Sequence, residues 1–129
     1  MDKATLVGID VEAGKNLLKL LDGAEFKVVA ALWLLLPEFA DWRLWIASPV
    51  VDAEGIKAGY RRIYSVWRTV PEPDSIDFAQ INAVSPKNRL IRELRRRFGK
   101  TASVEGMRLG GHTIGDRFVE DAYVYKVKR

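Results

Sequence analysis

The sequence predicts a mixed α/β chain of the α+β class. We expect a single two-layer domain over residues 1–129, with a five-stranded mixed sheet and three helices in the order αββαβαββ. The 129 residues, 48% of them hydrophobic, suffice for one continuous core. Three segments carry apolar residues at helical spacing, and five others are alternating or continuously apolar, as strands are.

The first predicted elements are a helix and a buried strand. Apolar leucines fall on one face of residues 11–22, with Asp10 as the expected N-terminal cap and Gly23 as the stop. Residues 26–36 are almost continuously apolar, which is typical of a strand covered on both faces.

The middle of the chain predicts a hairpin partner and the longest helix. Residues 42–47 alternate in polarity and should pair with the preceding strand. Asp52 is the expected cap of a helix over 52–69. A linker with two prolines, residues 70–77, then leads into a short strand at 78–84.

The last third predicts a basic helix followed by a hairpin. Ser85 and the proline after it favour a helix start, with the helix continuing to residue 98. Residues 106–114 and 117–127 should form two strands joined by a tight turn at Gly115-Asp116.

Composition excludes several chemistries. The chain has no cysteine and one histidine, which rules out disulfides, thiolate metal sites and a cysteine nucleophile, and disfavours zinc. No phosphate loop, dinucleotide fingerprint, zincin or serine-hydrolase motif is present. We therefore expect no cofactor and no metal, and favour a protein that is not an enzyme.

The hydrophobic segments predict a cytoplasmic protein without a membrane partner. Residues 1–15 have no apolar core of signal-peptide length, and the longest apolar run, residues 28–36, is far below a membrane span. The net charge is +4, but residues 1–50 carry −2 and residues 51–129 carry +6. The basic character therefore belongs to the C-terminal part.

The helix within residues 86–100 holds seven basic residues against one acid, Glu93. Arg89, Arg92 and Arg96 fall on the side opposite an apolar stripe, which consists of Leu90, Ile91, Leu94 and Phe98. Such a face is typical of a solvated surface or of a patch for an acidic protein. Because arginine forks bind phosphates, nucleic acid is the alternative partner.

The predicted hairpin places His112 opposite Val119 and Arg108 opposite Tyr123, with Asp121 diagonal to His112 and Arg108. One hypothesis makes His112 a general base oriented by Asp121, with Arg108 and Tyr123 binding an anion, as in a small phosphodiesterase or nuclease. The favoured alternative is that Asp121 simply pairs with Arg108.

Strand alternation also predicts which side of this hairpin is buried. Glu120 disturbs the division because it falls on the core side. The expected core side holds Met107, Leu109, Phe118, Ala122 and Val124, and the polar side holds Arg108, His112, Arg117, Asp121, Tyr123 and Tyr125. Gly110-Gly111 is expected to mark a β-bulge rather than a phosphate loop.

Two further sites are open in the sequence. Trp42 and Trp45 should face opposite sides of their strand, so an uncovered Trp45 beside Arg43 would anchor a partner or a second copy, unless a neighbouring element covers it. Carboxylates could converge on a cation only through the fold. They are Asp10, Glu12, Asp116, Glu120 and Asp121.

The strings AALWLLLPEFADWRLWIASPVVD (30–52) and RFVEDAYVYKV (117–127) resemble segments of small bacterial proteins that are described only as hypothetical. The resemblance implies no function and supplies no active residues. The expectation from the residues is a non-enzymatic interaction module that binds an acidic protein or itself. A nucleic-acid-binding protein that uses helix 86–98 is the first alternative, and a small phosphodiesterase or nuclease is the second.

Overall fold

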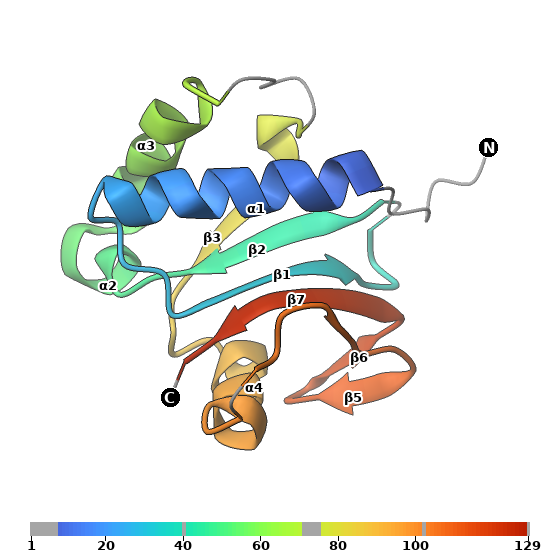
Figure 1. Cartoon of the computed structure of the whole chain (residues 1–129). Coiled ribbons are helices and arrows are strands. Elements are labelled where there is room, and N and C mark those ends of the chain that lie inside the picture. The colour runs from blue at the N-terminus through green and yellow to red at the C-terminus, as the bar shows by residue number, and fades with distance from the viewer. Residues whose placement is uncertain (1–7, 40, 71–75, 102, 129) are drawn as a thin grey trace.

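The computed structural model of the chain describes residues 8–39, 41–70, 76–101 and 103–128. Figure 1 shows α-helices around a central sheet, with a short two-stranded sheet beside it. The helices are α1 (Gly8–Gly23), α2 (Val50–Glu54), α3 (Ile56–Trp67) and α4 (Arg89–Phe98), with a short 3-10 helix, η2 (Phe78–Gln80). The strands are β1 (Ala30–Leu35), β2 (Arg43–Ala47), β3 (Ile81–Val84), β4 (Met107–Arg108), β5 (His112–Ile114), β6 (Arg117–Val119) and β7 (Asp121–Val127).

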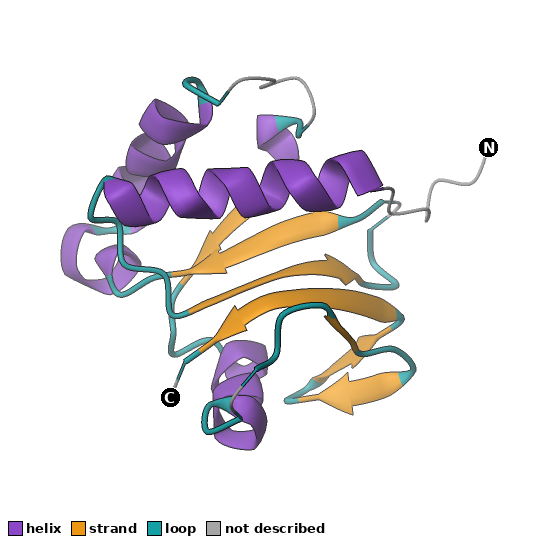
Figure 2. Cartoon of the chain, in the orientation of Figure 1, coloured by secondary structure: helices purple, strands orange, loops and turns teal. Residues whose placement is uncertain are grey.

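The predicted five-stranded mixed sheet is confirmed (Figure 2). Its strand order is β3-β2-β1-β7-β4, and β5 and β6 form the separate pair. β2 and β3 are parallel, whereas β1 pairs antiparallel with β2 and β7. β1 therefore lies at the centre, as the apolar run in its sequence predicts.

Two hydrophobic cores lie on the two faces of the sheet. Alternate residues of β1 enter different cores: Leu32 and Leu34 face α4 and the β5–β6 hairpin, and Trp33 faces α1 and α3. The sequence predicts two layers, but the structure has three. The additional layer consists of α4 and the neighbouring β5–β6 hairpin, which cover the second face of the sheet. The fold class is otherwise as expected.

The predicted helix over 52–69 is two helices. Gly55 separates α2 from α3 and has φ 95°, a backbone conformation that interrupts helical hydrogen bonding. Asp52 therefore lies inside α2, and Asp10 lies inside α1, so neither is the predicted cap. Among the described helices α1 is the longest, and none is long and apolar enough to cross a membrane.

The basic helix begins later than predicted. Asn88, not Ser85, is its cap, and Asn88 Oδ1 accepts hydrogen bonds from the backbone N–H groups of Leu90 and Ile91. Ser85 Oγ accepts from Lys87 N and donates to Asp52 Oδ1 at 2.8 Å. Ser85 thus closes a turn before the helix.

The register predicted for the C-terminal hairpin is confirmed: His112 pairs with Val119 and Arg108 with Tyr123. The predicted faces are only partly right. The ladder is interrupted at Glu120, whose backbone N–H donates to Leu35 O at 3.0 Å. The faces exchange across this interruption, so Phe118 is 48% exposed. Tyr125, at the register shift between β7 and β1, is buried because α1 covers the face that it shares with Tyr123.

Candidate functional site

The outward face of α4 carries the arginines that the sequence singles out. Leu90, Ile91 and Leu94 are buried against the sheet, as predicted. The side chains of Arg89 and Arg96 are 75% and 70% exposed, and Arg92 is also exposed. The helix therefore displays guanidinium groups on its solvent side.

Two carboxylates lie among these arginines. Asp116 approaches Arg89, with Oδ2 to Nη1 at 3.5 Å. Glu93 accepts hydrogen bonds from Arg96 and Arg97, at 2.5 and 2.6 Å between Oε2 and the donor nitrogens. These two hydrogen bonds, that of Arg96 first, lower the pKa of Glu93 to about 2. Glu93 is thus ionised at neutral pH, and the α4 face has mixed sign.

The β5–β6 turn brings Asp116 to the start of α4. Gly115 in this turn has φ 67°, which favours glycine, and a Cβ added there would lie 3.0 Å from Arg89 O. The predicted glycine turn therefore also permits a close approach between hairpin and helix. We define the α4 face as the exposed residues Arg89, Arg92, Arg96 and Arg97, together with the partly buried Glu93 and with Asp116.

At its other end, α4 is tied to the last strand. Arg95 Nε donates to Lys128 O at 2.8 Å, and Lys128 N donates to Val29 O at 2.7 Å. Because β7 pairs directly with β1, these bonds couple the helix to the centre of the sheet. The α4 face is consequently held at both ends.

The hairpin does not assemble the hypothesised general base. Arg108 binds Asp121 through Nε and Nη2, at 3.3 and 2.5 Å, and Asp121 Oδ1 also accepts from Ala122 N. The His112 side chain is exposed and makes no hydrogen bond within the described part of the chain. Tyr123 packs edge-on against Tyr125. The geometry matches the structural alternative, in which Asp121 pairs with Arg108.

Trp45 is covered rather than available to a partner. Its side chain is 4% exposed and lies in the core that faces α4. The guanidinium of Arg117 stands 5.8 Å from the Trp45 ring and pairs with Glu38 at 3.1 Å. Arg43 lies over the Phe39 ring and beside Asp41. The expected opposite placement of Trp42 and Trp45 is confirmed, because Trp42 enters the other core.

The carboxylates considered for a cation do not converge. Within residues 8–39, 41–70, 76–101 and 103–128, no group of three or more histidine, aspartate or glutamate side chains could hold a metal ion. Two of the five acids are bound to arginines instead: Asp116 pairs with Arg89, and Asp121 pairs with Arg108.

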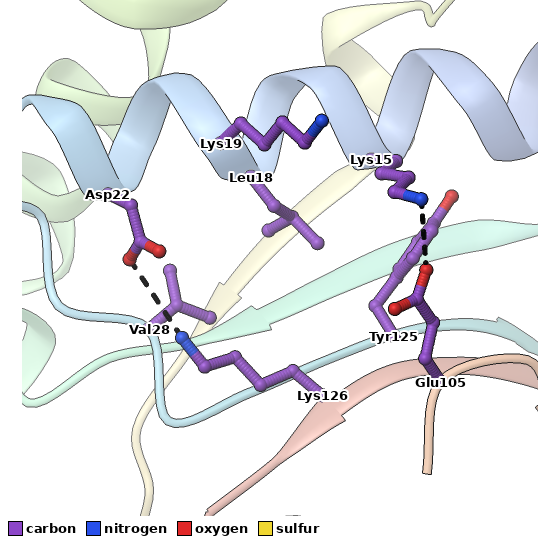
Figure 3. A pocket seen from close by; sticks show the side chains of 8 residues that line it. All are labelled: Lys15, Leu18, Lys19, Asp22, Val28, Glu105, Tyr125 and Lys126. Atoms are coloured by element: carbon purple, nitrogen blue, oxygen red, sulfur yellow. Dashed lines mark ion pairs between the residues drawn. The ribbon is translucent and has the colours of Figure 1, made fainter. Parts of the chain in front are cut away.

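A pocket of about 230 Å³ lies between α1 and β7 (Figure 3). Its charges are largely paired, with Lys15 Nζ 3.2 Å from Glu105 and Lys126 Nζ 3.8 Å from Asp22. Burial lowers the pKa of Lys126. The lining residues are Lys15, Leu18, Lys19, Asp22, Val28, Glu105, Tyr125 and Lys126. The ion pairs tie α1 to the C-terminal strand and to the segment before β4.

Sequence reasoning missed a second basic face, on α3. Lys57 and Arg61 are exposed on this helix, Arg68 is exposed at its C-terminal cap, and the exposed ring of Tyr64 lies among them. Their spacing of four, seven and eleven residues from Lys57 is visible in the sequence and predicts one helical stripe. The higher local charge of helix 86–98 and the outward spacing of its arginines favoured α4 instead.

Comparisons with protein families, with curated proteins and with solved structures found no match to this chain.

Proposed function

We propose that this protein is a non-enzymatic interaction module that binds an acidic surface of a partner protein through the α4 face. The observation that carries the proposal is the outward display of Arg89, Arg92 and Arg96 on a helix whose opposite side is anchored in the core. Arginine is enriched at protein interfaces, where its planar fork binds carboxylates through two hydrogen bonds.

The mixed sign of the α4 face favours a protein over a nucleic acid. Glu93 and Asp116 lie among the arginines and would repel a backbone of phosphates, whereas a protein surface can supply both carboxylates and cations. No aromatic residue occurs between Arg89 and Arg97. We therefore propose a protein partner for the α4 face, and the experiment includes nucleic acid as the alternative ligand.

One exposed aromatic ring lies on the β5–β6 hairpin. Phe118 lies on β6, opposite Thr113, on the side of the hairpin that faces away from the core residues Ile114 and Val119. The same hairpin carries Asp116 to Arg89. Aromatic residues near arginines supply much of the binding energy of protein interfaces, so Phe118 is the apolar anchor that we propose beside the α4 face.

The test uses a fluorescein-labelled helical peptide with glutamates four residues apart, and fluorescence anisotropy over a range of salt concentrations. In Arg89→Ala/Arg92→Ala/Arg96→Ala we expect affinity to fall by about tenfold or more, since exposed ion pairs contribute up to about 1 kcal/mol each. The control is Lys57→Ala/Arg61→Ala/Arg68→Ala, which removes the same charge from α3.

Selective loss in the α4 variant supports the proposal. Equal loss in both triple variants would mean that only net charge matters, which contradicts the proposal. The proposal would also be contradicted if the unmodified protein did not bind the peptide at low salt. Duplex DNA serves as the comparison probe. If duplex DNA bound the α4 face more tightly than the peptide, the nucleic-acid alternative would replace the proposal.

A further inference from the structure

The exposed stripe of α3 is uniform in sign. At 100° per residue, Lys57, Arg61, Tyr64 and Arg68 fall within an arc of about 60° on one side of the helix. All four are exposed, while Gly59 and Ile63 on the other side are buried. We define these four residues as the α3 face. It lies on the opposite side of the sheet from the α4 face (Figure 1).

None of the acids that the structure describes neutralises the cations of the α3 face. No acidic residue occurs in Ile56–Trp67. Lys57, Arg61 and Arg68 form no ion pair with any described residue, and the nearby carboxylate of Glu54 is held by Arg62 at 2.8 Å. Asp52 accepts a hydrogen bond from Ser85, and Asp77 caps η2. This face therefore differs from the α4 face, where acids lie among the arginines.

Tyr64 is a supported aromatic platform at the centre of this stripe. Its ring is 46% exposed and stands 5.2 Å from the Phe78 ring, at an interplanar angle of 88°. Trp67 packs against both rings, and its Nε1 donates to Ile76 O at 2.9 Å. These contacts fix the ring without covering it, which leaves area for a planar group to stack.

We propose that the α3 face binds single-stranded nucleic acid. One base stacks on Tyr64, and the flanking phosphates are bound by Arg61 and Arg68, with Lys57 contacting the strand further along. Proteins that bind single strands combine basic side chains, which follow the backbone, with aromatic rings on which bases stack. A duplex keeps its bases stacked on one another, so it could use the cations but not the ring.

The helix spaces these groups suitably for a strand that runs along its axis. Arg61 and Arg68 are seven residues apart, which is about 10 Å along an α-helix, and Tyr64 lies between them. The three cations give the salt-dependent attraction to phosphates, and the ring supplies a sequence-tolerant contact. This site is separate from the proposed protein-binding face and does not depend on it.

The test is fluorescence anisotropy with a fluorescein-labelled oligothymidine of about 12 nucleotides, within the usual site size for single-strand binding. Tyr64→Ala should weaken binding about tenfold, because stacking on one aromatic ring contributes about 1–3 kcal/mol. Tyr64→Phe keeps the ring and should retain the affinity. Arg61→Ala/Arg68→Ala should weaken binding and lower its salt dependence.

The matched control is Arg89→Ala/Arg96→Ala, which removes two arginines from the α4 face and should leave oligonucleotide binding nearly unchanged. The inference is overturned if Tyr64→Ala binds as the unmodified protein does, if both arginine pairs cause equal losses, or if an oligothymidine–oligoadenosine duplex binds as tightly as the single strand. Because the peptide and oligonucleotide assays use opposite variants and controls, failure of one proposal is distinguishable from failure of the other.

Discussion

The hydroxyl of Tyr125 accepts a hydrogen bond from Trp33 Nε1 at 2.8 Å. It also donates one to Val11 O at 2.6 Å. These two bonds connect β7, β1 and α1 inside the core on the α1 side of the sheet. Burial raises the pKa of Tyr125 well above its usual value, so the hydroxyl keeps its proton and remains a donor.

Tyr125→Phe should lower the free energy of unfolding by about 2 kcal/mol, because the buried N–H of Trp33 loses its acceptor. Urea denaturation followed by tryptophan fluorescence measures this change. Tyr123→Phe is the control, since the Tyr123 hydroxyl makes no hydrogen bond with the described residues, and stability should change little. An equal effect of the two substitutions would contradict this role for Tyr125.

Gly14 permits α1 to approach this tyrosine. A Cβ added at Gly14 would lie 2.3 Å from the Tyr125 hydroxyl oxygen and 2.9 Å from Cζ. Gly14→Ala should therefore destabilise the protein, although alanine favours a helix by about 1 kcal/mol over glycine. Gly23→Ala meets no atom within 4 Å and is the matched control in the same helix. Thermal unfolding of both variants checks the prediction, and a stabilised Gly14→Ala protein would refute it.

Glu93 should give α4 a measurable dependence on pH. Its pKa is lowered from 4.5 to about 2 by hydrogen bonds from Arg96 and then Arg97. A carboxyl whose pKa is lower in the folded state stabilises that state above its unfolded pKa. This contribution is therefore lost as the pH falls from about 4.5 toward about 2.

Carbon-detected NMR titration of the Glu93 carboxyl measures the pKa directly. In Arg96→Ala the pKa of Glu93 should move back toward 4.5, because the hydrogen bond that lowers it most is gone. Arg92→Ala leaves both donors in place and is the control. A midpoint near 4.5 in the unmodified protein would show that the ion pairs do not persist in solution.

The pairing of the C-terminal hairpin was predictable because a two-residue glycine turn determines which residues face each other across both strands. The sequence did not predict correctly which side of the hairpin is buried. The exchange of faces depends on Glu120 leaving the ladder to bond Leu35, a contact between segments far apart in the sequence. Phe118 was misassigned for this reason. Tyr125 was misassigned because α1 covers the face of β7 that was expected to be polar.

The same distinction applies to the candidate surfaces. The outward position of Arg89 and Arg96 followed from helical spacing, as did the opposite placement of Trp42 and Trp45. The ion-pair partners of these arginines did not follow from helical spacing. Asp116 reaches Arg89 only because the hairpin packs on α4. For Trp45, burial depends on an element that sequence alternation alone does not identify.

The proposal that α4 is the protein-binding face is tested most directly by mapping backbone amide NMR shifts during titration with the acidic peptide. We expect the perturbed amides to cluster in residues 89–97 and in the turn at 115–118, with α3 unaffected. Perturbations concentrated in residues 56–68, or none at saturating peptide, would contradict the proposed function.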